Sequence, residues 1–184
     1  MKTRRLFAGI AVAATEALRE VAAALRRELR GERIRWVPPE NLHLTLEFFG
    51  EIEAGRIPGL EAALAKAAAG TREFTVKIGG PGAFGGARHP RVVWLGIDSE
   101  GLRELRGRAV AALREAGWEP EPREFAPHLT LGRMEGVRDL RRFRESMERH
   151  RGSPAQEQAV KELIFFETVS GRYVPRNRWS LAGT

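Results

Sequence analysis

The chain has 184 residues, of which 42% are hydrophobic and 30% charged, and this composition fits a globular domain with a sizeable apolar core. It contains no cysteine, which excludes disulfides, thiol catalysis and cysteine-ligated zinc. The net charge of +7 suits a polyanionic partner such as RNA. An excess of arginine over lysine also arises from genome composition or thermal adaptation, so the charge alone does not decide the partner.

The N-terminal segment has two interpretations. A basic start followed by the apolar residues 6–14 resembles a short signal peptide. The same stretch fits a buried strand over residues 6–12, and we favour the strand because the internal repeat described below uses it. No apolar run reaches the length of a transmembrane helix, so we expect a cytoplasmic protein that does not enter a membrane.

Hydrophobic periodicity predicts two similar halves. The first half has the order strand, helix, strand, helix, strand over residues 6–12, 16–30, 42–48, 58–69 and 73–78. The same order recurs over residues 91–97, 102–116, 128–131, 137–150 and 160–166. The glycine-rich segment 79–90 is expected to be the connecting loop, and a last strand over residues 172–181 is expected to pair back onto one sheet.

The spacing of matching residues supports this repeat. Gly9 and Gly96 are 96 − 9 = 87 residues apart, and His43 and His128 are 128 − 43 = 85 residues apart. We therefore predict an α+β fold of two β-α-β-α-β repeats, whose antiparallel sheets are related by a pseudo-two-fold axis around a central cleft. Residues 1–184 are expected to form a single bilobal domain, with halves at about 1–80 and 90–184.

Each half carries the same short motif, His-Leu-Thr-Leu, beginning at His43 and at His128. Residues two apart in a strand share a face, so each histidine points with Thr45 or Thr130 to one side while the leucines point into the core. One copy alone is most often an ordinary half-buried strand. Chance gives Leu-Thr-Leu after a histidine on the order of once in several thousand, from typical residue usage. Two copies in equivalent places of a repeat therefore indicate a function.

Two imidazoles facing one phosphorus atom suit the cleavage of a phosphodiester. One can deprotonate the nucleophile while the other protonates the leaving oxygen, because histidine titrates near neutral pH. Two threonine hydroxyls can donate hydrogen bonds to the non-bridging oxygens as charge builds on them. Such a pair needs one neutral and one protonated imidazole, which predicts a bell-shaped dependence of activity on pH.

A metal site is the alternative for paired histidines, and it needs a third and usually a fourth ligand. Glu47 follows Thr45 and is expected on the same strand face, whereas Gly132 stands at the equivalent place in the second half. We therefore favour a site without a metal.

Other histidines and aromatic residues have ordinary explanations. His89 is expected to be a solvated loop residue, and His150 to end a helix, where a cation is favourable. Phe7, Phe48 and Trp94 could stack on a base, although aromatic residues in strands are more often part of the core.

The duplicated motif with its flanks resembles the two-histidine (2H) phosphoesterases. Within them the chain is most similar to the bacterial and archaeal RNA 2′,3′-cyclic phosphodiesterases, formerly described as 2′-5′ RNA ligases. The similarity runs nearly end to end and includes residues 5–8, 41–50, 90–96, 127–133 and 171–175.

The resemblance implies a role for each residue of the site. His43 would be the proton donor to the leaving 3′ oxygen, and His128 the proton acceptor that activates water. Thr45 and Thr130 would hold the phosphate, with Arg133 near it. The family's fold is bilobal α+β with a pseudo-two-fold cleft, and its members use neither metal nor nucleotide cofactor.

The implied activity is hydrolysis of RNA ends that carry a 2′,3′-cyclic phosphate, tRNA fragments among them, to a 2′-phosphomonoester. The family also performs reversible 2′-5′ RNA ligation in vitro. Two alternatives remain open at this point: a phosphodiesterase for small cyclic phosphates, such as cyclic nucleotides or ADP-ribose cyclic phosphate, and a non-catalytic RNA-binding module. We expect a monomer, because an internal two-fold axis completes the site without a second chain.

Overall fold

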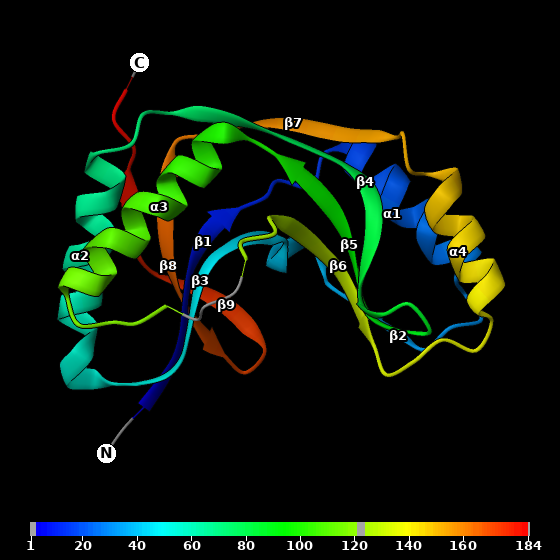
Figure 1. Cartoon of the computed structure of the whole chain (residues 1–184), viewed down its shortest axis with the longest axis horizontal. Coiled ribbons are helices and arrows are strands. Elements are labelled where there is room, and N and C mark those ends of the chain that lie inside the picture. The colour runs from blue at the N-terminus through cyan, green and yellow to red at the C-terminus, as the bar shows by residue number, and fades with distance from the viewer. Residues whose placement is uncertain (1–2, 121–123, 184) are drawn as a thin grey trace.

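A computed structural model describes residues 3–120 and 124–183. Within these residues, nine strands form one curled sheet in the order β7-β4-β5-β6-β3-β1-β8-β9, with β2 paired to β6 (Figure 1). The first half supplies β1 (Thr3–Ala11), α1 (Glu16–Glu28), β2 (Ile34–Trp36), β3 (His43–Glu53), α2 (Ile57–Ala69) and β4 (Phe74–Gly86), with short 3-10 turns at Pro39–Asn41 and Ala54–Arg56. The second supplies β5 (His89–Asp98), α3 (Glu100–Glu115), β6 (His128–Met134), α4 (Leu140–Arg149), β7 (Pro154–Val160), β8 (Glu162–Val169) and β9 (Arg172–Ser180).

The two halves of the sheet match on either side of its centre. The motif strands β3 and β6 meet there, and each is flanked by the first strand of its own half, β1 or β5. Both motif strands begin with the same succession: half-buried, buried, half-buried, buried, buried, exposed, buried. The two successive buried residues mark a β-bulge, and the register against β1 and against β5 shifts at the same place. The predicted α+β fold and its repeat are confirmed, although the strands of both halves join in one sheet.

Polar caps explain where the helices begin. The side chains of Thr15 and Ser99 each accept a hydrogen bond from the backbone three residues further on, at the starts of α1 and α3. Asp139 does the same for α4, which therefore begins at residue 140 and not at the expected residue 137.

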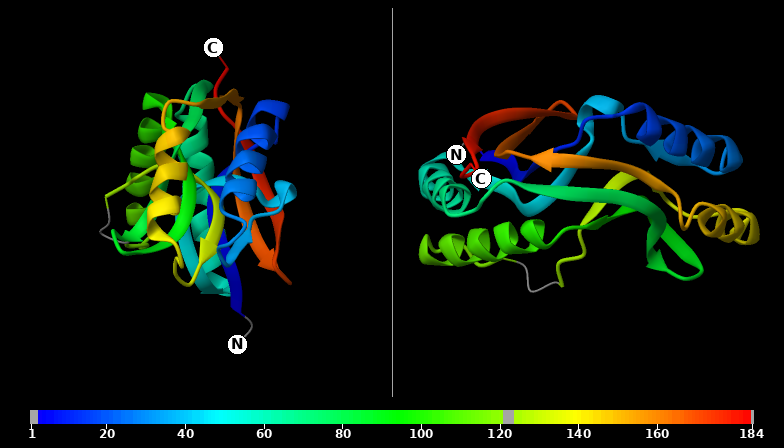
Figure 2. Two further views of the ribbon diagram at one scale, coloured as in Figure 1. Left: turned by 90° about the vertical axis from the view of Figure 1, so that its right-hand side faces the viewer. Right: turned by 90° about the horizontal axis from the view of Figure 1, so that it is seen from above.

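Two pairs of helices flank the sheet, and each pair combines one helix from each half of the chain (Figure 2). The carboxylate of Glu28 on α1 lies 2.8 Å from Arg149 and 3.0 Å from His150 at the end of α4. Lys66 on α2 lies 2.5 Å from Glu115 on α3. These contacts join the two sequence repeats in space. Among the described residues, no helix is both long and apolar enough to cross a membrane.

The glycine-rich segment 79–90 is not the loop that its composition predicts. Strand β4 runs through it to a tight turn at residues 87–88, and β5 returns beside it. A Cβ atom added at Gly82 would lie only 2.3 Å from Cη2 of Trp94. Glycine is required here because a large ring crosses the neighbouring strand, so a composition typical of loops marks a hairpin instead.

Two strands are additions to the predicted elements. β2 is short and pairs only with β6, and β7 precedes the expected strand at 160–166, which divides between β7 and β8. Strands as short as β2, or as polar as β7, carry little periodic signal.

Gly9 sets the distance between β1 and the first motif strand. A Cβ atom at this position would lie 2.3 Å from the carbonyl oxygen of Leu44. We expect Gly9→Ala to lower the free energy of unfolding by about 1–3 kcal/mol, because the backbone beside the first motif must move. The control Gly107→Ala lies within α3 with open space around it and should raise stability by about 0.5–1 kcal/mol. Denaturant unfolding measures both, and equal effects of the two changes would contradict the close approach.

Candidate active site

The two motif strands place their histidines and threonines on one face of the sheet. Strand β3 starts at His43 and β6 at His128, and their antiparallel pairing aligns Leu44 with Leu129. The two leucines are 1% and 0% exposed, so they point into the core and the flanking residues take the other side. By this register each histidine stands beside the threonine of the opposite strand. We call this side of the sheet the histidine face.

Each imidazole is oriented by a backbone carbonyl two residues earlier. Nδ1 of His43 lies 2.7 Å from the oxygen of Asn41, and Nδ1 of His128 lies 2.8 Å from that of Ala126. A carbonyl oxygen only accepts, so Nδ1 carries the proton and donates. Nε2 of each ring is therefore the atom left for chemistry.

Aromatic rings enclose both imidazoles. The ring of His43 packs against both Phe7 of β1 and Tyr173 of β9, with centroids 4.8 and 4.7 Å away. The ring of His128 meets Phe84 of β4 edge-on at 4.6 Å. These contacts fix the imidazoles from the side and remove water from around them.

Tyr173 and Phe84 are parts of the site that the sequence pattern did not predict. Both come from hairpins, and the reach of a hairpin along a sheet is not visible in local patterning. The side chain of Asn41 holds the second hairpin: its amide donates to the oxygen of Gly171 (3.1 Å) and its oxygen accepts from the backbone of Tyr173 (3.4 Å). Asn41 therefore positions His43 through its carbonyl and Tyr173 through its side chain.

The aromatic residues named from the sequence divide into two kinds. Phe7 is 3% exposed and belongs to the wall around His43, while the ring of Trp94 lies 6.4 Å from that of His128. Phe48 is 46% exposed, with the guanidinium of Arg5 over its ring at 5.2 Å. Of the three, Phe48 presents the largest free aromatic surface.

Burial lowers the pKa of both His43 and His128 below the usual 6.5, and the hydrogen bond to the carbonyl opposes this only in part. The positive charge of Arg133 lowers both pKa values further, and His128 adds to the effect on His43. Arg133 follows the bulge of β6, is exposed, and so stands near both rings. At neutral pH the free protein therefore holds two largely neutral imidazoles, and a bound phosphate anion would favour protonation.

Glu47 does not lie on the histidine face, and the expectation that it shares the face of Thr45 is wrong. The bulge in β3 turns its carboxylate into the core, where it is 5% exposed and lies 2.5 Å from the guanidinium of Arg106. The indole nitrogen of Trp118 also donates to it, at 3.3 Å. Across the described part of the chain, no three His, Asp or Glu residues gather closely enough to hold a metal ion.

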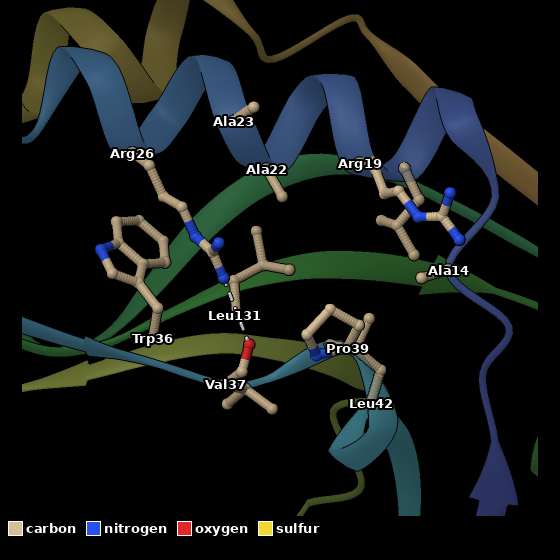
Figure 3. Close-up of a pocket in the computed structure, with 11 residues that line it drawn as sticks. Ala14, Arg19, Ala22, Ala23, Arg26, Trp36, Val37, Pro39, Leu42 and Leu131 are labelled. Carbon is tan, nitrogen blue, oxygen red and sulfur yellow. Dashed lines mark hydrogen bonds between the residues drawn. The ribbon is translucent and has the colours of Figure 1, made fainter.

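The remaining histidines lie on other elements. His89 begins β5 and is exposed, and His150 caps the end of α4 with Nε2 3.0 Å from Glu28. A hollow of about 280 Å³ lies behind the motif leucines, between α1 and the segment that follows β2 (Figure 3). Its lining includes Leu42 and Leu131, which point away from the histidine face, so the hollow is separate from the site.

Comparison with known proteins places this arrangement in a family. The family model described as LigT like Phosphoesterase matches residues 9–94. The RNA 2′,3′-cyclic phosphodiesterase of Methanothermobacter thermautotrophicus is 34% identical over 148 residues, which are 79% of this chain and 78% of that protein. The chain belongs to the LigT-like phosphoesterases.

Two further relatives agree with this membership. The RNA 2′,3′-cyclic phosphodiesterase of Archaeoglobus fulgidus is 35% identical over 71% of this chain and 72% of its own. The crystal structure of E. coli LigT complexed with 3′-AMP superimposes with a TM-score of 0.72 at 27% identity, covering 98% of this chain and 99% of that one. Like these relatives, the present LigT-like phosphoesterase is an enzyme.

The environment of the two imidazoles can be measured directly. We expect His43 and His128 to titrate below pH 6.5 in the free protein, because both are desolvated and near Arg133. NMR titration of the imidazole resonances measures this, with His43→Ala and His128→Ala to assign the signals. Adding inorganic phosphate should move both midpoints upward. A midpoint above 6.5 for either residue in the free protein would contradict the described burial.

The buried ion pair of Glu47 gives a second test. We expect Glu47→Ala to lower the free energy of unfolding by about 3–5 kcal/mol, because it leaves the guanidinium of Arg106 buried without its counterion. Thermal unfolding measures the loss. The double variant Glu47→Ala, Arg106→Met should recover much of it, and no recovery would mean that the pair is not the source of the cost.

Proposed function

We propose that this enzyme hydrolyses the 2′,3′-cyclic phosphate at the end of an RNA chain to a 2′-phosphomonoester, with His43 and His128 as general acid and base. The observation that carries the proposal is the pair of imidazoles on one face of the sheet, each with Nδ1 committed to a carbonyl and Nε2 left for chemistry. The names of the curated relatives, RNA 2′,3′-cyclic phosphodiesterase, supply the substrate class.

The reaction follows from acid–base chemistry at the two Nε2 atoms. Water attacks the phosphorus, and Nε2 of neutral His128 takes a proton from that water as the new P–O bond forms. The bond from phosphorus to the 3′ oxygen breaks, and Nε2 of protonated His43 gives its proton to that oxygen. The phosphate keeps its negative charge and its bond to the 2′ oxygen, so the product is the 2′-monoester. The assignment of donor and acceptor follows the family resemblance, because the symmetric motifs treat the two histidines alike.

The other site residues would stabilise the phosphate. Thr45 and Thr130 stand beside the opposite histidines in the strand register, where their hydroxyls can donate to the non-bridging oxygens. Arg133 would neutralise part of the charge that develops in the transition state. A phosphate between the two rings also favours protonation of His43, which the site alone disfavours.

Several narrower features belong to the same proposal. The reaction needs no metal, since two imidazoles supply both proton transfers. With a 5′ hydroxyl in place of water as the nucleophile, the same ring opening would form a 2′-5′ linkage, as the bond from phosphorus to the 3′ oxygen breaks and His43 protonates that oxygen. We further propose that residues 1–184 act as one bilobal domain, as a monomer, in the cytoplasm.

One assay tests the mechanism and its main rivals. We expect an oligoribonucleotide ending in a 2′,3′-cyclic phosphate to be hydrolysed in EDTA, and both His43→Ala and His128→Ala to lose on the order of a hundred-fold or more in kcat. The control His89→Ala changes a histidine on another element and should retain the wild-type rate.

Other outcomes favour the alternatives. Loss of wild-type activity in EDTA would overturn the metal-free mechanism. Turnover of 2′,3′-cyclic AMP without turnover of the oligonucleotide would indicate a phosphodiesterase for small cyclic phosphates. Tight binding of the oligonucleotide with no turnover would indicate an RNA-binding module.

A further inference from the structure

Strand β2 places a second arginine directly beside Arg133. The register of β2 against β6 pairs Ile34 with Met134, Arg35 with Arg133 and Trp36 with Gly132. Residues directly opposite each other in an antiparallel pair point to the same face. Arg35 therefore shares the histidine face with Arg133, and both side chains are exposed.

Two like charges directly opposite each other cost free energy unless an anion lies between or above them. Many arginines of this protein avoid such a cost through carboxylates: Arg4 and Arg176 both bind Glu167, for example. Within residues 3–120 and 124–183, no carboxylate lies within ion-pair distance of Arg35 or Arg133. Arg35 and Arg133 thus form a strongly positive patch without a carboxylate partner in the described part of the chain.

The position of Arg35 is fixed by packing. A Cβ atom at Gly132 would lie 2.5 Å from Cγ2 of Ile34 and 3.1 Å from Cε3 of Trp36, so glycine allows β2 to lie close against β6. Arg26 of α1 also lies over the ring of Trp36 at 5.5 Å and donates to the carbonyl of Val37 (Figure 3). Contacts with both β6 and α1 hold β2 in place and keep Arg35 next to Arg133.

Arg35 and Arg133 lie at one end of the row of candidate site residues on β6. Along β6 the histidine face presents His128, then Thr130, then Arg133, and Arg35 lies one strand further out. Thr130 and Arg133 are about 7 Å apart along the strand, at two ladder steps of roughly 3.3–3.4 Å each. In the first half, the place of Arg133 is taken by Phe48. The two-fold symmetry is therefore broken: the second half pairs two arginines on the histidine face, where the first half has Phe48 with the guanidinium of Arg5 over its ring.

We infer that Arg35 binds the phosphate on the 5′ side of the terminal nucleotide, so that the enzyme distinguishes an RNA chain from a mononucleoside cyclic phosphate. This inference rests on the proposed function and adds to it a specificity-determining residue. The reacting cyclic phosphate lies between the histidines and beside Arg133. The next phosphate in the chain, one nucleotide away, meets the guanidinium of Arg35. A nucleoside 2′,3′-cyclic phosphate has no such group and leaves Arg35 unused.

Two small substrates isolate this contact. Adenosine 2′,3′-cyclic phosphate and its 5′-phosphorylated form differ only in the phosphate that Arg35 would bind. We expect the wild-type enzyme to have the lower KM for the 5′-phosphorylated form, and Arg35→Gln to raise that KM about tenfold, the usual effect of one charged hydrogen bond. Arg35→Gln should leave kcat for both substrates, and KM for the substrate without a 5′ phosphate, within about twofold. Arg35→Lys keeps the charge and should recover part of the loss.

A matched control separates a local contact from overall charge. Arg27→Gln removes one exposed positive charge from α1, on another element of the structure, and should change neither KM. For an oligoribonucleotide, Arg35→Gln should reduce the slope of log affinity against log salt by about 0.7, and Arg27→Gln should not. The melting temperature of Arg35→Gln at low salt should equal or exceed that of the wild type, because the opposing charge is gone.

Different outcomes test the role of Arg35 and the proposed function. Equal effects of Arg35→Gln on both substrates, or an effect matched by Arg27→Gln, would overturn the role of Arg35. If the wild-type enzyme turned over neither of these substrates nor the oligoribonucleotide that ends in a 2′,3′-cyclic phosphate, the proposed function would fail. Equilibrium binding of adenosine 2′-phosphate and adenosine 2′,5′-bisphosphate would then test Arg35 by itself. A preference for the bisphosphate that Arg35→Gln abolishes supports the contact, and no preference overturns it.

Discussion

The contact between β3 and β6 is the constraint on which the rest of this protein depends. Each motif strand contributes a leucine to a shared core, and burial of Leu44 against Leu129 holds the strands in one antiparallel register. Because side chains alternate along a strand, burying the leucines forces both histidines and both threonines onto the opposite face. A slip of either strand by one residue would turn its own histidine and threonine into the core. Burial of the motif leucines therefore brings the motif histidines and threonines together on one face.

The histidine face is symmetric in its imidazoles and asymmetric around them. Both rings have the same tautomer, and both have aromatic neighbours from a hairpin. At the bulges the two halves differ. Glu47 in the first half forms a buried ion pair with Arg106, whereas Gly132 at the equivalent position of the second half leaves room for β2. The duplicated frame thus presents two equivalent imidazoles within surroundings that differ.

Burial and charge act on the imidazoles in the same direction. Desolvation and Arg133 both disfavour the imidazolium form, so the pKa values of the two histidines are lowered. In the mechanism that we propose, the general acid must nevertheless carry a proton. The negative charge of the substrate phosphate would favour that protonation, so that protonation of the acid is linked to binding. This coupling explains how two basic side chains and an arginine can share one small region of the sheet.

The sequence by itself determined the duplicated motif, the two-half α+β architecture and the face on which His43 and Thr45 lie together, because local periodicity records which side of a strand is buried. It did not determine where Glu47 points, since a β-bulge depends on the partner strand. It also misplaced the glycine-rich hairpin, in which the ring of Trp94 on the neighbouring strand requires glycine at position 82. The aromatic walls of Phe84 and Tyr173, and the pairing of Arg35 with Arg133, were decided by tertiary structure alone. Each of them joins residues far apart in the chain, and local patterning carries no record of such neighbours.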